Sequence, residues 1–180
     1  MALSVVLGTA CGGGEGGGGE RDGGDLISGP DPGSQPTTSG GELTDAQVSM
    51  LSRAPSGWTY YRNRRDTLSR SSGSGHSESH LRTRYNEVAA AQLGADGKVR
   101  GNAVFADSSL IVKELIAEGT LNRYAIMMKM RASDNAGDGW LWAYYRPDGS
   151  TLISITSRGA ACTGCHSTGI DYTRMNDSYP

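Results

Sequence analysis

The sequence predicts an α+β fold that is mainly an antiparallel β-sheet with a few short helices. Stretches rich in β-branched and aromatic residues are separated by short connections with turn residues, and such connections join antiparallel strands. Helical patterns are few and short. The chain has 180 residues and a formal net charge of −2, which suits one domain plus a tail and gives no reason to expect a nucleic-acid partner.

The N-terminus, residues 1–11, runs through apolar and small side chains into Cys11. This resembles the end of a truncated bacterial lipoprotein signal in which Cys11 is the residue to be lipidated. The match is imperfect, because Leu7 stands four residues before the cysteine and no basic segment precedes it. The stretch is too short to span a bilayer. The alternative is a plain disordered N-terminus with a free cysteine.

Residues 12–43 predict a disordered tether. Fourteen of the 27 glycines fall within residues 1–44, and three prolines follow among Ser, Thr and Gly. Such a composition cannot form a hydrophobic core. We therefore expect the folded domain to span residues 44–180.

The expected elements of this domain follow in order. Thr44 and Gln47 form a capping-box pattern, which predicts a helix over residues 46–54 that ends before Pro55. Asn86 is placed to cap a second short helix, which Gly94 closes. Residues 69–79 are rich in Ser and Gly and predict a loop. The predicted strands span residues 57–61, 80–85, 109–116, 123–131, 140–146 and 151–156.

Near the C-terminus, residues 162–166 read Cys-Thr-Gly-Cys-His, the attachment motif of a c-type haem. Two thiols separated by two residues can each add to one vinyl group of the same porphyrin. The histidine that follows can then bind the iron as an axial ligand. The motif predicts one covalently attached haem per chain, with Cys162 and Cys165 as attachment sites and His166 as iron ligand.

Three other interpretations of the cysteines compete. A thioredoxin-like redox pair would follow a strand in a βαβ unit, and no such unit surrounds residues 150–170. A zinc site could combine the cysteines with His76 and His80, but the two pairs lie about 80 residues apart and His166 would be unused. A Cys162–Cys165 disulfide would close a very small loop and gain little stability. Covalent haem is the favoured interpretation.

Several further segments stand in a defined order over about residues 57–175. They are Gly57-Trp58 with Tyr60-Tyr61, residues 80–86, residues 105–109 leading into 110–115, residues 127–129, residues 138–140 with Ala143-Tyr144, and the Cys-x-x-Cys-His motif followed by Asp171-Tyr172. In order and spacing, this set resembles the cytochrome P-460 / cytochrome c′-beta family.

The resemblance implies a β-rich homodimer with a haem on each C-terminal motif and a largely apolar distal face. Members of the P-460 branch oxidise hydroxylamine, whereas members of the c′-beta branch bind nitric oxide and similar small gases at a five-coordinate iron. In P-460 members a lysine is also bonded to the porphyrin, and the matching segment here supplies Lys113. P-460 enzymes use a distal carboxylate on the strand that matches residues 124–130, which here contain no Asp or Glu. This favours gas binding over catalysis.

Lys113 can also be judged from its own strand, where it shares a face with Ile111 and Leu115. An amine on an apolar face has a lowered pKa, and the neutral amine can act as a nucleophile or a ligand. The alternative is that its stem runs along the sheet and its ammonium group reaches solvent at an edge. Glu114 should point to the opposite face.

Two further groups bear on the sixth coordination site of the iron. Phe105 is the one phenylalanine of the chain and matches the aromatic residue before the lysine strand, so the resemblance implies a place in the distal pocket. Core packing is the alternative. Met175 is a candidate sixth ligand, as in an electron carrier, while Met128 and Met130 are expected to fill the core.

The sequence therefore predicts an exported c-type mono-haem cytochrome in the periplasm or another extracytoplasmic compartment, anchored through lipidated Cys11. Its expected ligand is nitric oxide or a related small nitrogen species. The alternatives are a hydroxylamine-oxidising oxidoreductase and a plain electron carrier, whose protein partner the sequence does not identify.

Overall fold

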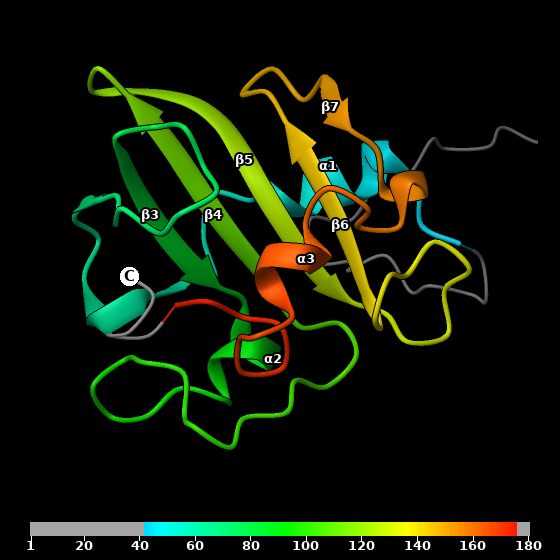
Figure 1. Cartoon of the computed structure of the whole chain (residues 1–180), viewed down its shortest axis with the longest axis horizontal. Coiled ribbons are helices and arrows are strands. Elements are labelled where there is room, and N and C mark those ends of the chain that lie inside the picture. Colours follow the sequence, from blue (N-terminus) through cyan, green and yellow to red (C-terminus); the bar gives the residue numbers. More distant parts are fainter. Residues whose placement is uncertain (1–41, 176–180) are drawn as a thin grey trace, which may run out of the picture. The chain divides into compact units, whose positions relative to one another are not determined.

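The computed structural model describes residues 42–175, and its main feature is one antiparallel sheet (Figure 1). This confirms the predicted fold class. The first 41 residues, with Cys11, the predicted signal and most of the predicted tether, lie outside the described part. In spatial order the strands are β1 (Thr59–Tyr60), β3 (His80–Tyr85), β4 (Leu110–Ala117), β5 (Thr120–Lys129), β6 (Trp140–Tyr145) and β7 (Thr151–Ile153), and β2 (Leu68–Ser69) also pairs with β3.

The helices are short and their ends follow the predicted capping residues. In α1 (Asp45–Ser52), the Thr44 side chain accepts a hydrogen bond from the Gln47 backbone and the Gln47 side chain accepts one from the Thr44 backbone. Asn86 caps α2 (Glu87–Ala90) through the Ala89 N–H. The remaining elements are η1 (Tyr61–Asn63), η2 (Ile155–Ser157) and α3 (Thr163–His166).

Strict alternation of side chains gives the sheet two buried faces, each with its own cluster. The front face carries the row Tyr85, Ile111, Met127 and Trp142, whose members are paired across four strands. The rear face carries the row Arg84, Val112, Ile126 and Ala143. Cys162, at the start of α3, packs into the front cluster, and Val48 of α1 packs into the rear one. In Figure 1, α3 accordingly lies in front of the sheet and α1 behind it.

Most element boundaries differ from the prediction by a few residues, and two differences have clear causes. The first predicted strand shortens to β1 because η1 begins at Tyr61, where Arg62 and Asn63 both take left-handed backbone angles. The helix after Asn86 ends at Ala90, and the chain then turns so that Leu93 can pair with Val99.

Glu42 and Leu43 belong to the fold, so the predicted tether, residues 12–43, extends two residues too far. Leu43 is buried in the rear cluster. The Glu42 carboxylate accepts hydrogen bonds from the Ser133 hydroxyl and the Asp134 backbone N–H. The ordered packing therefore begins before the cap of α1.

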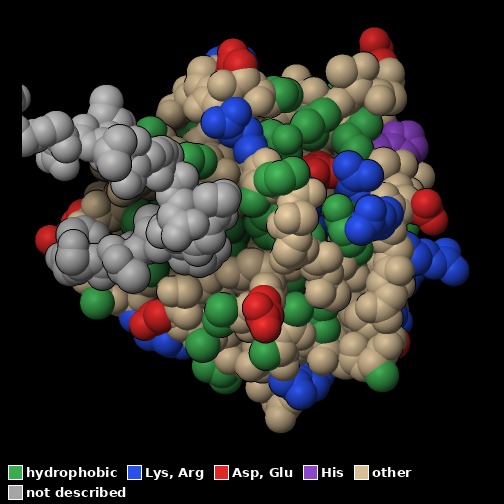
Figure 2. Space-filling view, turned by 180° about the vertical axis from the view of Figure 1, so that it is seen from behind, with side chains coloured by type: hydrophobic (Ala, Val, Ile, Leu, Met, Phe, Trp, Pro, Cys, Tyr) green, Lys and Arg blue, Asp and Glu red, His purple; other side chains and the backbone are tan. Residues whose placement is uncertain are grey.

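The surface carries charges of both signs. Figure 2, which views the molecule from behind Figure 1, shows acidic and basic side chains interspersed over that face. None of the helices within residues 42–175 has the length and apolar character needed to cross a bilayer.

Candidate haem site

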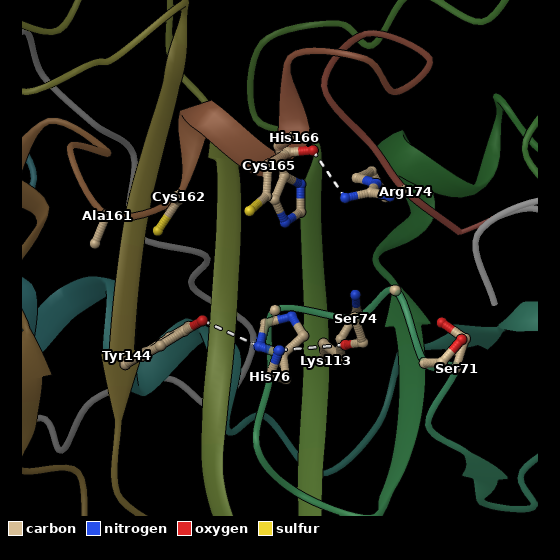
Figure 3. A pocket seen from close by; sticks show the side chains of 13 residues that line it. Ser71, Ser74, His76, Lys113, Tyr144, Ala161, Cys162, Cys165, His166 and Arg174 are labelled. Carbon is tan, nitrogen blue, oxygen red and sulfur yellow. Dashed lines mark hydrogen bonds between the residues drawn. The ribbon is translucent and has the colours of Figure 1, made fainter.

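The predicted haem motif forms a single helical turn on the front face of the sheet. The backbone N–H groups of Cys165 and His166 both donate to the Cys162 carbonyl, at 3.2 Å each. Residues at positions i, i+3 and i+4 of a helix share one side. The two thiols and the imidazole therefore line the same cavity, whose volume is about 360 Å³ (Figure 3). This size falls within the range of ligand pockets in proteins, roughly 300–1,000 Å³.

The His166 ring is held at one nitrogen and faces the cavity with the other. Its Nδ1 lies 2.7 Å from the backbone carbonyl oxygen of Tyr172, and because a carbonyl can only accept, Nδ1 carries the proton. Nε2 is then the unprotonated nitrogen, as an iron ligand requires. Trp142 packs edge-on against the imidazole with ring centroids 5.0 Å apart. The ring is thus fixed both in tautomer and in orientation.

The position of the Tyr172 carbonyl depends on an unusual piece of backbone. Asp171 and Tyr172 both have positive φ angles, 44° and 66°, which non-glycine residues seldom adopt. The Asp171 carboxylate holds this segment in place, since it accepts from Lys129 Nζ at 2.7 Å and from the Phe105 backbone N–H at 2.8 Å. The family resemblance includes Asp171 and Tyr172 but predicts no role for either.

Trp142 reaches His166 because Gly159 leaves room for it. A Cβ atom added at Gly159 would lie 2.4 Å from a carbon of the Trp142 ring, a distance that no packing tolerates. Gly159 also has a φ of +72°. Glycine at this position is therefore required by both the contact and the backbone angle.

The sheet forms the back wall of the cavity through the row that includes Lys113. Lys113 pairs with Thr83 on one side and with Ala125 on the other, and Ala125 pairs in turn with Tyr144. Lys113 and Tyr144 both line the cavity. Burial, and then the charge of Arg174, lower the pKa of Lys113 to about 8. A fraction of the amine is therefore neutral near physiological pH.

The wall opposite α3 comes from the loop between β2 and β3. Residues 71–76 line the cavity, and Figure 3 shows His76 and His166 on opposite sides of it. His76 Nδ1 lies 3.0 Å from the Tyr144 hydroxyl. Burial, followed by the charges of Lys113 and His166, lowers the pKa of His76 to about 3. His76 is therefore a neutral imidazole at neutral pH.

The same loop is anchored to the sheet by a buried carboxylate. Glu78 forms an ion pair with Arg123 at 2.7 Å and accepts a hydrogen bond from Asn122 at 2.8 Å. Burial alone would raise the pKa of Glu78, but the hydrogen bonds from Arg123 and Asn122 outweigh it and lower the pKa to about 2. The sequence predicts only a Ser/Gly-rich loop over this segment. It indicates neither the buried ion pair of Glu78 nor the place of His76 in the cavity wall.

The disulfide and the βαβ redox unit find no support in the described residues, and of the two histidines in the zinc alternative only His76 lines the cavity with the cysteines. Cys162 and Cys165 are not bonded to each other. The surrounding sheet is antiparallel throughout, unlike a βαβ redox unit. His80 is exposed on β3, and within residues 42–175 no group of three or more His, Cys, Asp or Glu is arranged to hold a metal ion by itself.

The other candidate residues lie away from the larger cavity. Phe105 is fully buried and packs edge-on against Trp140, with ring centroids 5.5 Å apart, and it is not among the cavity-lining residues. Met128 and Met130 belong to the rear cluster. Met175 is buried in the front cluster and lines only a smaller hollow of about 30 Å³ beside His166.

The acidic residue beside Lys113 in the sequence also lies on the other side of the sheet. Glu114 pairs on the rear face with Arg82 and Arg84. Among the described residues that line the larger cavity there is no Asp or Glu. The described part of the cavity wall therefore offers no carboxylate that could accept a proton from a substrate.

The residues present fit a haem attached at this site. Two unpaired thiols and an imidazole with a free Nε2 lie on one turn of helix and face one cavity. Lys113 and Arg174 line it without any acidic residue, which suits the two carboxylates of a haem. The Tyr85 hydroxyl is buried without a hydrogen-bond partner among the described residues, and Tyr85 lines the smaller hollow beside His166.

Comparison with known proteins adds no assignment: no protein-family model matches the chain, and no curated protein matches it.

Proposed function

We propose that the chain is an exported c-type mono-haem cytochrome that binds nitric oxide or a related small nitrogen ligand at its haem iron. The observation that supports this most directly is the convergence of Cys162, Cys165 and His166 on one cavity, with His166 Nδ1 already engaged by the Tyr172 carbonyl. Neither the disulfide nor the redox-pair interpretation of the cysteines gives His166 a role.

Each residue of the motif has a distinct role. Cys162 and Cys165 would hold a haem by adding their thiols to its two vinyl groups, each S–H bond and vinyl double bond giving way to a C–S and a C–H bond. His166 would bind the iron through Nε2, and its hydrogen bond to the Tyr172 carbonyl increases the electron-donating strength of that nitrogen. When bound, the haem iron supplies a coordination position for a small diatomic or nitrogen-containing ligand.

The wall that faces His166 favours ligand binding over simple electron transfer. It consists of the Ser and Gly residues 71–75 together with His76, Lys113 and Tyr144, and no methionine within residues 42–175 lines the larger cavity. A six-coordinate electron carrier with a methionine as its second ligand would need that methionine on this wall. Met175 lies instead in the front cluster.

Hydroxylamine oxidation is the second candidate, and the position of Lys113 favours it. The family resemblance places a porphyrin-bonded lysine at Lys113, which lines the cavity with a pKa lowered to about 8. The reaction also requires a proton acceptor near the substrate, and no carboxylate is present among the described cavity residues. Gas binding therefore ranks first.

The compartment and assembly remain part of this proposal. Covalent haem attachment and lipidation of Cys11 both occur outside the cytoplasm, so the two ends of the sequence agree on a periplasmic or other extracytoplasmic location. A homodimer and an electron-donating protein partner are proposed from the family resemblance alone.

Acid extraction and a gas titration test the proposal. The protein is exported in a host that attaches c-type haem, purified, and treated with acidified organic solvent. We expect the haem to stay with the wild-type chain, and a Cys162→Ala, Cys165→Ala double variant to hold no haem after the same treatment. The reduced wild type should change its optical spectrum with one equivalent of nitric oxide. Release of haem from the wild type, or no spectral response to nitric oxide, would contradict the proposal.

A further inference from the structure

The wall opposite His166 contains a second imidazole that the haem motif does not account for. His76 reaches the cavity from the loop between β2 and β3, and Figure 3 shows it beside Tyr144 and Lys113. His76 is half-buried. The same loop comes close to α3, because a Cβ atom added at Gly75 would lie 3.7 Å from Cys165 Sγ. His76 thus occupies the side on which a small ligand would bind.

The Tyr144 hydroxyl sets the orientation and the tautomer of His76. Within the described residues, His76 Nδ1 is the one hydrogen-bond partner of this hydroxyl, at 3.0 Å. Burial raises the pKa of Tyr144 to about 12, so the phenol keeps its proton at neutral pH. Because a phenol is a better hydrogen-bond donor than acceptor, we infer that the hydroxyl donates and Nδ1 accepts. The proton of the neutral imidazole is then on Nε2, which becomes a hydrogen-bond donor.

Tyr144 is itself held in place by the network that anchors the loop. The Arg123 guanidinium lies over the Tyr144 ring, 4.8 Å from its centroid, and is fixed by its ion pair with Glu78. Glu78 stands two residues after His76 in the same loop. One cluster therefore fixes both the loop that carries His76 and the hydroxyl that orients it, and such support is typical of groups that must be held in one geometry.

We propose that His76, oriented by Tyr144, donates a hydrogen bond from Nε2 to the small ligand on the open side of the haem, and so selects ligands that gain negative charge on binding. This inference rests on the proposed function. Dioxygen and nitroxyl gain such charge and cyanide already carries it, whereas carbon monoxide gains little charge. His76 touches the ligand, and Tyr144 is a positioning residue. A protonated Nε2 has no lone pair for iron, so this tautomer also keeps His76 from becoming an axial ligand.

The test uses the haem-loaded protein and four variants. His76→Leu removes the donor, His76→Gln keeps an N–H group, and Tyr144→Phe removes only the group that orients the imidazole. His80→Leu is the matched control, because His80 is exposed on β3 and does not line the cavity. Two quantities are measured: the C–O stretching frequency of the carbon monoxide complex, and the ratio of cyanide affinity to carbon monoxide affinity.

We expect His76→Leu to raise the C–O stretching frequency and to lower the affinity ratio by about tenfold to a hundredfold, the range for one hydrogen bond to a charged group. His76→Gln should retain part of the effect, Tyr144→Phe should lose part of it, and His80→Leu should match the wild type. Unchanged values in His76→Leu would overturn the inference while leaving the haem assignment intact. A six-coordinate wild type that becomes five-coordinate in His76→Leu would also overturn it, because His76 would then be an iron ligand. A wild type without attached haem would overturn the proposed function as well.

Discussion

The Nδ1 atom of His166 and the backbone carbonyl oxygen of Tyr172 lie 2.7 Å apart, and this contact joins the haem motif to the C-terminal segment that follows it. It determines which nitrogen of His166 faces the cavity. The carbonyl is turned toward the ring by two consecutive left-handed residues, Asp171 and Tyr172. A strained segment of this kind persists only where neighbouring contacts hold it.

Asp171 supplies those contacts, so its removal should weaken both the fold and the orientation of His166. In Asp171→Ala, the buried Lys129 ammonium loses its partner, and we expect the free energy of unfolding to fall by about 3 kcal/mol. Asp107→Ala is the control, because Asp107 pairs with a largely exposed Arg131 and should cost less than about 1 kcal/mol. Denaturant unfolding of both variants measures the difference. Equal losses would show that the Lys129–Asp171 pair does not stabilise the C-terminal segment.

Glu78 should make the stability of the protein depend on acid pH. Its pKa is lowered to about 2 in the folded state, whereas the ordinary value is 4.5. Above pH 4.5 the carboxylate therefore stabilises the fold, and this contribution is lost as the pH falls from 4.5 toward 2. We expect Glu78→Gln to lower the free energy of unfolding by about 2 kcal/mol at pH 7.

The difference between wild type and Glu78→Gln should shrink as the pH is lowered toward 2, and unfolding followed at several pH values measures it. Asp66→Asn is the control, since Asp66 is exposed and should change little. A difference that stays constant with pH would mean that the Arg123 and Asn122 contacts do not stabilise the charged form of Glu78.

The parts of the fold that the sequence predicted are those fixed by local patterns. Alternation of polar and apolar residues predicts the observed limits of β3, His80–Tyr85. The capping residues Thr44 and Asn86 predict where α1 and α2 begin. The Cys-x-x-Cys-His spacing likewise places its three functional side chains on one side of a helical turn, because that geometry depends only on neighbouring residues.

The rest of the candidate site depends on contacts between distant segments. His76 and Tyr144 form a hydrogen bond although they are 68 positions apart in the chain, and Phe105 and Asp171 do so at a separation of 66. No periodicity within the Ser/Gly-rich loop indicates where its histidine lies. The Tyr172 contact uses a backbone carbonyl, which every residue has, so its position could not be read from the residue type.

The start of the domain can be tested by truncation. A chain that begins at Thr44 lacks Leu43, which is buried in the rear cluster, and Glu42, which binds Ser133 and Asp134. We expect it to be less stable by about 2–3 kcal/mol than a chain that begins a few residues earlier, mainly because the Leu43 side chain is lost from the core. Thermal or denaturant unfolding measures this. Equal stability of the two chains would place the start of the folded domain at Thr44.

Substitution of Lys113 tests whether the protein binds gas or oxidises hydroxylamine. The family resemblance links this chain to an enzyme through this residue. Its amine lies in the cavity with a pKa lowered to about 8 by burial and by Arg174, and the ordinary value is 10.5. A buried amine of this kind can take part in bond formation. The cavity residues that the structure describes nevertheless include no carboxylate. The His76 tautomer favoured by Tyr144 presents a hydrogen-bond donor to the ligand instead of a proton acceptor.

We therefore expect the wild type to bind nitric oxide readily and to oxidise hydroxylamine slowly, and Lys113→Ala to leave both properties nearly unchanged. Lys98→Ala is the control, since Lys98 is not among the residues lining the cavity. Hydroxylamine turnover, nitric oxide titration and the ferrous optical spectrum are measured for all three proteins, together with intact mass and peptide mapping to find any third bond to the porphyrin. Rapid hydroxylamine oxidation by the wild type that is lost in Lys113→Ala, with a return to an ordinary c-type spectrum, would reverse the ranking. The proton acceptor would then have to be Lys113 itself or His76 in its other tautomer. Hydroxylamine turnover by His76→Leu, compared with the wild type, would distinguish the two, because it falls only if His76 is the acceptor.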